Sequence, residues 1–178
     1  MPIPHRLAPY KPSNEEFVRM EMLLGQIEDK IFDHKNKNVP EIQELINEWN
    51  KNASREFEFH EFRDLHYYTD SESFIHSAFY QIKYIDDLSF QEAIALINIF
   101  FETHLHEPDV YYAKDLLERN FPNIDISDLI FWPNDWFQDN ELEAELTTEE
   151  ILGYAIARSG RYLPDAPDIE LKYPIPLN

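Results

Sequence analysis

Apolar residues recur every three or four positions in the first third of the chain, which is the spacing of one helix face. Ser13 followed by Glu16 forms a capping box, and the apolar stripe behind it predicts a helix over about 14–35. Pro40 suits the first position of a second helix, because a proline there loses no helical hydrogen bond. The two predicted core-facing stripes are Phe17, Met20, Leu24, Ile27 and Ile31, then Ile42, Leu45, Ile46 and Trp49.

The middle of the chain has a less regular pattern. The stretch "NASREFEF" interrupts the helical spacing, and shorter helices are expected near 59–67 and 71–84. Ser89 and Glu92 form a second capping box in front of "FQEAIALINIFFETHL". Because that segment is apolar on most of its circumference, we expect it to be the central helix of a bundle.

Two further helices are predicted towards the C-terminus. Pro108 can begin one through "DVYYAKDLLERN", and Thr147 with Glu150 forms a third capping box before "ILGYAIARSG", where Gly160 suits the helix end. These signals predict an all-α fold, a single-domain multi-helix bundle with extended proline-rich termini. An α+β fold is the alternative, because "FIHSAFYQIKYI" could form a pair of strands.

The prolines are concentrated at the two ends of the chain. Eight of the twelve lie in residues 1–12 and 164–176, which favours extended backbone there. We therefore expect an extended N-terminal arm over 1–13, a helical domain over 14–160 and an extended C-terminal tail over 161–178. The last residues, "ELKYPIPLN", are apolar enough that we expect them to dock on the helical domain.

Composition narrows the classes of function. The absence of cysteine removes disulfides, thiol catalysis and cysteine-ligated zinc, and three glycines offer no glycine-rich phosphate loop. A net charge of −20 disfavours nucleic acid and anionic lipid as partners and favours basic proteins. No apolar run has the length of a membrane span, so we expect no membrane partner and a cytoplasmic location.

Metal and cofactor sites are not predicted. The residues after Asp135 lack both the ligand spacing and the glycine of an EF-hand loop. His104 and His106 stand two apart at a helix end, with no recognised set of further ligands nearby. His60 and His66 in "HEFRDLH" are six apart instead of four, so they do not share a helix face as zinc-protease histidines do. No catalytic arrangement can be singled out from the serines or the many carboxylates either.

The charge pattern of residues 120–157 is the most unusual feature. This window holds nine acidic residues and no lysine or arginine, so like charges are left to repel. Glu149 and Glu150 are explained by the first turn of a helix, where its dipole favours acids. The remaining acids surround "FWPNDWF", whose tryptophans form either a packed corner or an exposed anchor. A solvated face is one interpretation; a surface for a basic protein is the other, with candidate residues Trp132, Asp135, Trp136, Asp139, Glu141, Glu143 and Glu145.

In size, acidity, lack of cysteine, expected helical fold and the acidic-aromatic stretch from Trp132 to Glu150, the chain resembles small acidic bacterial toxin-immunity proteins. The resemblance is one of type and includes no specific motif. It implies a non-enzymatic inhibitor that binds a basic toxin domain, such as a nuclease. A secretion chaperone or adaptor, a DNA mimic and an enzyme of unknown class remain alternatives.

Overall fold

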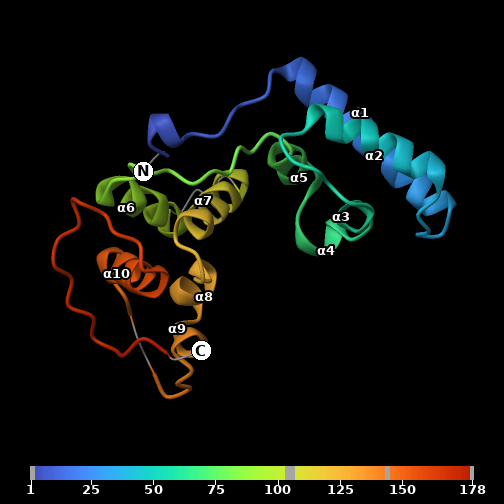
Figure 1. Ribbon diagram of the computed structural model, residues 1–178. Helices are drawn as coiled ribbons and strands as arrows, with labels where there is room; N and C mark the ends of the chain where they lie inside the picture. The colour runs from blue at the N-terminus through green and yellow to red at the C-terminus, as the bar shows by residue number, and fades with distance from the viewer. Residues whose placement is uncertain (1–2, 103–106, 143–144, 177–178) are drawn as a thin grey trace. The chain divides into compact units, whose positions relative to one another are not determined.

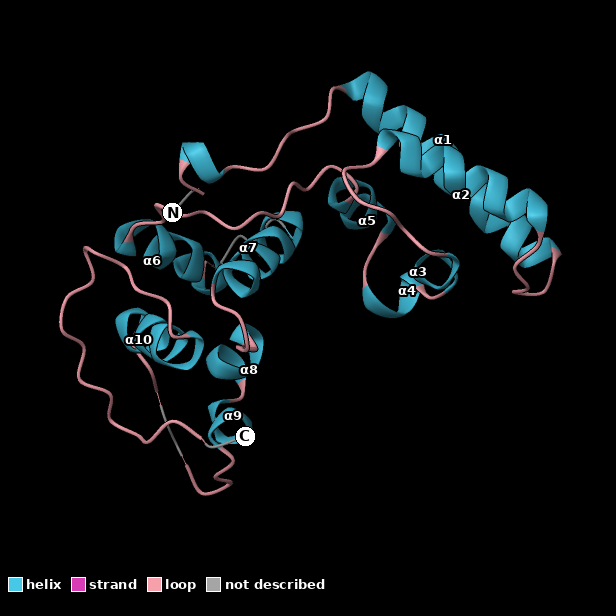
Figure 2. Cartoon of the chain, in the orientation of Figure 1, coloured by secondary structure: helices cyan, strands magenta, loops and turns pink. Residues whose placement is uncertain are grey.

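We describe the protein from a computed structural model over residues 3–102, 107–142 and 145–176. Within these ranges the chain forms ten α-helices, two 3-10 turns and no strand (Figures 1 and 2). This confirms the all-α prediction. The α+β alternative is wrong for "FIHSAFYQIKYI", because its first four residues end a helix and the others form turns and irregular backbone.

The chain divides into two compact units, each with its own core. The N-terminal unit consists of Pro9–Gln81, and the C-terminal unit combines Met1–Ala8 with Ile82–Asn178. The boundary at residue 81 falls inside the range 14–160 that the sequence analysis assigns to one domain.

The N-terminal unit is built on a pair of helices, α1 and α2, which pack side by side (Figure 1). Both begin where the sequence predicts, α1 behind the Ser13–Glu16 capping box and α2 at Pro40. The expected helix near 59–67 is two short helices that break at Asp64, and the one near 71–84 ends seven residues early. The helices of this unit are α1 (Asn14–Asp33), α2 (Pro40–Asn52), α3 (Phe59–Arg63), α4 (Leu65–Tyr68) and α5 (Ser71–Ser77).

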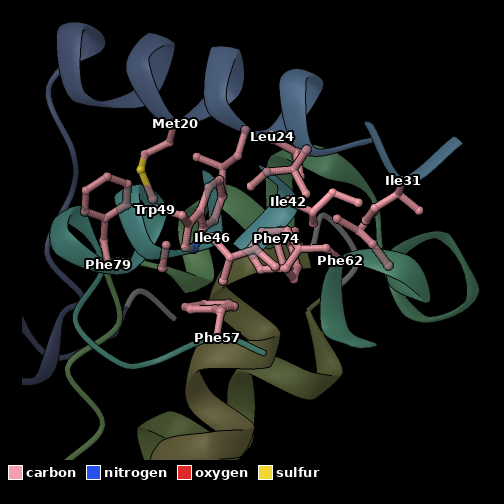
Figure 3. Packing of buried hydrophobic residues seen from close by; sticks show 14 residues of the cluster. Met20, Leu24, Ile31, Ile42, Ile46, Trp49, Phe57, Phe62, Phe74 and Phe79 are labelled. Carbon is pink, nitrogen blue, oxygen red and sulfur yellow. The ribbon is translucent and has the colours of Figure 1, made fainter. Parts of the chain in front are cut away.

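Trp49 lies at the centre of the core of this unit (Figure 3). Its side chain has no exposed surface, and its ring centroid lies 5.8, 5.3 and 5.5 Å from those of Phe57, Phe62 and Phe74. Asn50 holds the chain next to this cluster, because its Nδ2 donates to the Phe57 carbonyl and its Oδ1 accepts from the Phe57 N–H. The predicted apolar stripes of α1 and α2 supply much of the remaining core.

The C-terminal unit packs α6 against α7 and α10, and α8 against both of the latter. The Ser89–Glu92 and Thr147–Glu150 capping boxes are both formed, and Gly160 ends the last helix with a left-handed φ of +69°. The expected central helix is shorter than predicted, because it turns to 3-10 geometry at Ile99. The helices of the C-terminal unit are α6 (Phe90–Asn98), η2 (Ile99–Phe101), α7 (Glu107–Asn120), α8 (Ile126–Phe131), α9 (Pro133–Phe137) and α10 (Thr148–Ser159).

The N-terminal arm was expected to be extended over 1–13, but it is not extended throughout. His5–Leu7 form a 3-10 turn, η1, and Leu7 is buried in the C-terminal unit. The Tyr112 hydroxyl donates to the Leu7 carbonyl at 2.7 Å. Next to it, Arg6 pairs with Asp87 and Glu92, so this end of the arm is attached by both apolar and charged contacts.

The C-terminal tail has no helix over residues 161–176; it is irregular, with a turn at 164–165 and a bend at 172–173. It begins at a buried arginine, Arg161, whose Nη1 donates to the carbonyl and Oδ1 oxygens of Asn120 at 2.9 and 2.7 Å. Its Nη2 donates to the Ile85 carbonyl, and its guanidinium lies over the Tyr84 ring at 4.4 Å. Neutral oxygens and an aromatic face thus stabilise this buried cation.

None of the helices in the described ranges is both long and apolar enough to span a membrane.

Candidate partner-binding surface

The predicted site residues follow one another along a short part of the C-terminal unit. Trp132 joins α8 to α9, and Asp135 and Trp136 lie on α9. Asp139 and Glu141 lie in the turn that follows, and Glu145 precedes α10. Glu143 lies outside the described residues.

Local chemistry explains why two short helices form here instead of one. Asp125 caps α8, because its Oδ1 accepts from the Asp128 N–H at 3.0 Å. Pro133 has no N–H to continue that helix and instead begins α9. Gln138 ends α9 in the left-handed region, with φ of +56°, and Asp139 Oδ1 then accepts from the Glu141 N–H at 3.1 Å.

The structure separates the two tryptophans. Trp136 and Phe137 form a packed corner: their ring centroids are 4.7 Å apart, and both rings meet Tyr154 of α10, at 5.7 and 4.9 Å. Both side chains are half-buried. Trp136 is thus tied to the body of its own unit and presents only part of its surface.

Trp132 has the other of the two expected settings, because 54% of it is exposed. Its ring meets Phe131 at 5.7 Å, and Phe131, itself 50% exposed, meets the buried Phe100 at 6.2 Å. Phe131 therefore connects an exposed tryptophan to the core. Phe131 is not among the predicted site residues, although it stands next to Trp132 in "FWPNDWF".

Carboxylates on α7, α8 and α9 lie close enough for their charges to affect one another. Partial burial raises the pKa of Asp128, and the charges of Asp125 and Asp135 raise it further. Burial likewise raises the pKa of Glu118 on α7, against the opposing effect of its ion pair with Lys114. The mutual repulsion shows that these acids share one surface. We define the acidic-aromatic surface as Asp125, Asp128, Phe131, Trp132 and Asp135. Asp125 and Asp128 are not among the predicted site residues.

Most basic residues of this unit are used elsewhere, whereas Lys114 pairs with Glu118 and offsets part of the rise in the pKa of Asp128. Its sequence contains 20 acidic and 7 basic residues, a net charge of −13. Five of those seven side chains are engaged in holding the fold together. Arg6, Lys114 and Lys172 pair with carboxylates, whereas Arg158 and Arg161 donate to backbone carbonyls.

Of the eight acids of the window that the structure describes, Glu150 alone is taken up by a lysine ion pair. Its side chain completes the capping box of α10 and pairs with Lys172 at 2.7 Å, which lowers its pKa. Asp135, Asp139, Glu141, Glu145 and Glu149 are exposed.

Metal and ligand sites receive no support from the described residues. The described residues contain no group of three or more acids and histidines placed to hold a metal ion. His104 and His106 lie outside the described residues. His60 and His66 pair with different glutamates, Glu58 at 3.4 Å and Glu28 at 2.7 Å. An open groove of about 490 Å³ on the N-terminal unit is lined by Gln26, Asp29, Lys30, Glu41, Glu44 and Leu45, none of them in the acidic-aromatic surface.

The chain matches no protein-family model, and no curated protein or solved structure matches it.

Proposed function

We propose that this protein is a non-enzymatic inhibitor of the immunity type. It binds and neutralises a basic toxin domain, such as a nuclease, through its acidic-aromatic surface, and acts in the cytoplasm of a bacterial cell. The observation that carries the proposal is the half-exposed Trp132–Phe131 pair beside carboxylates that repel one another and have no basic side chain in their sequence window.

Charge and ring have different tasks in such a complex. An unneutralised acidic surface attracts a basic partner over distance and raises the association rate, whereas a desolvated tryptophan slows dissociation once the complex has formed. Partial burial and the charges of Asp125 and Asp135 raise the pKa of Asp128, and a nearby lysine or arginine of the partner would lower it by stabilising the carboxylate. A nuclease groove lined by basic residues offers such side chains.

The first experiment identifies the partner. The tagged protein is recovered from its native cells at low salt, and co-purifying proteins are identified by mass spectrometry. We expect a basic toxin domain whose association weakens strongly as salt is raised. A partner whose binding is indifferent to ionic strength would instead favour a secretion chaperone or adaptor, which holds its client through apolar contacts.

A charge-reversal pair then tests the acidic segment that runs from Asp135 of this surface to Glu145. The test variant carries Asp135→Lys, Glu141→Lys and Glu145→Lys, all exposed positions in the acidic segment. The control carries Glu21→Lys, Glu44→Lys and Glu56→Lys, equally exposed but on the N-terminal unit, with the same change in net charge.

We expect the test variant to weaken the dissociation constant on the order of 100-fold at low salt, because it brings like charges together across the interface. The control should change it only a few-fold through the overall field. Equal effects of the two variants would show that net charge, and not this acidic segment, determines binding.

A further inference from the structure

The C-terminal tail makes contacts with α10 that an unstructured end would not make. Residues 169–176, here called the strap, run past α10 and reach α9 of the same unit (Figure 1). Upstream, the Asp165 carboxylate accepts from the Phe90 N–H at 2.9 and 3.0 Å and caps the first turn of α6. The chain is therefore attached to α6 just before the strap begins.

Gly153 explains how the strap comes so close to α10. A glycine inside a helix is less favourable than alanine by about 1 kcal/mol, so its presence calls for a reason. A Cβ at this position would lie 2.9 Å from Cγ2 of Ile169 and 3.0 Å from Cδ2 of Leu171. The missing side chain makes the space into which these two strap residues pack.

Polar contacts fasten the strap on both sides of this space. The Tyr173 N–H donates to the Tyr154 hydroxyl at 2.7 Å, and that hydroxyl lies 3.2 Å from the Tyr173 carbonyl, to which it donates. Lys172 pairs with Glu150 at 2.7 Å, and Arg158 donates to the Pro176 carbonyl at 2.6 Å. The expectation that the tail docks is thus confirmed, with α10 as the docking site.

The strap also contacts the helix that carries part of the proposed binding surface. The Tyr173 ring lies 5.4 Å from that of Phe137, which in turn lies 4.9 Å from Tyr154. Helix α9 has five residues, no side-chain N-cap and no fully buried residue. So short a helix does not persist in water without tertiary contacts. Phe137, held between Tyr154 and Tyr173, is a main source of those contacts.

We propose that the strap is a conformational latch for α9. When it is docked, Phe137 is held and α9 keeps Asp135 and the adjoining Trp132 in place. When it is released, Phe137 loses a ring contact, α9 opens, and the acidic-aromatic surface loses its arrangement. The effect on partner binding rests on the proposed function, whereas the coupling of the strap to α9 does not.

The two states are accessible without unfolding the rest of the unit. The strap residues are half-buried or exposed, and none is fully buried. Segments with few buried contacts open locally at a small part of the global free energy. Because linkage is reciprocal, a partner that needs α9 in place also holds the strap down.

Hydrogen exchange of the free, full-length protein tests the latch. The amides to follow are those of Trp136, Gln138 and Asp139, whose hydrogen bonds to Trp132, Asp135 and Asn134 define α9. Tyr173→Ala removes the ring by which the strap contacts Phe137, and the matched control is Tyr162→Ala, a tyrosine of the same tail that is 80% exposed. A second variant, Gly153→Ala, improves the helix propensity of α10 while its new methyl group displaces Ile169 and Leu171.

We expect Tyr173→Ala and Gly153→Ala to speed exchange in α9 on the order of fivefold, the factor for loss of one aromatic edge contact, with α6 and α7 unchanged. Tyr162→Ala should change nothing. The latch is wrong if α9 keeps its protection while the strap amides exchange freely, or if protection falls equally in α6 and α7. Since no partner is present, failure of the proposed function leaves this result unaffected, and a latch without inhibitory binding would overturn the function alone.

Discussion

Trp49 in the N-terminal unit and Trp132 in the C-terminal unit show two uses of the same side chain. Trp49 has no exposed surface and meets three phenylalanine rings, whereas Trp132 is half exposed and meets one. Closure on all sides makes the first ring a source of stability. Contact on a single side leaves the second ring available to a partner.

The charges around the two rings differ in the same way. On the N-terminal unit, basic and acidic side chains pair with one another: Lys30 with Glu41 at 3.3 Å, and Arg55 with Glu61 at 2.7 Å. Exposed pairs of this kind add little stability, but they keep the local field small. Beside Trp132 the acidic side chains repel one another, and their negative field is not cancelled. Exposure of a ring and accumulation of one charge therefore coincide on the C-terminal unit.

The largest expected effect concerns Trp49. Replacing it with alanine should lower the free energy of unfolding of the N-terminal unit by about 3–5 kcal/mol, because the change leaves a cavity between three phenylalanine rings. Urea denaturation, monitored by hydrogen exchange of the α2 amides, measures this loss of unfolding free energy. Trp132→Ala is the matched control and should lower stability by no more than about 1 kcal/mol; similar losses would erase the distinction between the two tryptophans.

The next effect reverses the comparison, because it concerns binding. Trp132→Ala should weaken binding of a basic partner by about 2 kcal/mol, roughly 30-fold, as expected of a tryptophan at the centre of an interface. Calorimetric titration with the partner recovered from native cells measures it. Tyr162→Ala, a change at a more exposed aromatic ring, is the control. Unchanged affinity for Trp132→Ala would remove the ring from the proposed surface.

A third prediction uses pH to compare paired with unpaired acids. The Arg6 guanidinium hydrogen-bonds Glu92 and lowers the pKa of that carboxyl from 4.5 to about 2. Its contribution to stability is therefore present above about pH 4.5 and is lost as the pH falls towards 2. Glu92→Gln should remove that part of the acid sensitivity, as urea midpoints between pH 2 and 7 would show. An unaltered acid profile would mean that the pair does not stabilise the unit.

The smallest effect is expected at Asp128, where the sign is opposite. Its pKa is raised, so its charge destabilises the fold above that pKa and protonation relieves the repulsion. Asp128→Asn should increase stability at pH 7 by about 0.2–0.5 kcal/mol, the usual size of a like-charge pair one helical turn apart, and should have no effect at pH 2. A loss of stability at pH 7 would show that Asp128 is not under repulsion.

Helix starts were the most predictable part of the fold. The boxes at Ser13, Ser89 and Thr147 are formed as expected, since a capping box needs only residues three positions apart. Helices α8 and α9 were not predicted, although Asp125 ahead of "ISDLIF" is a capping signal and Pro133 suits a first helical position. They are too short to show periodicity.

The sequence by itself determined the helical class, most helix starts and the concentration of acids in residues 120–157. These depend on residues close in the chain. Only the tertiary structure decided that Trp136 packs and Trp132 is exposed, that Arg6 and Lys172 are taken up by distant carboxylates, and that Gly153 makes room for the strap. Those outcomes depend on partners far apart in sequence, because burial and charge pairing are set by what packs nearby in space.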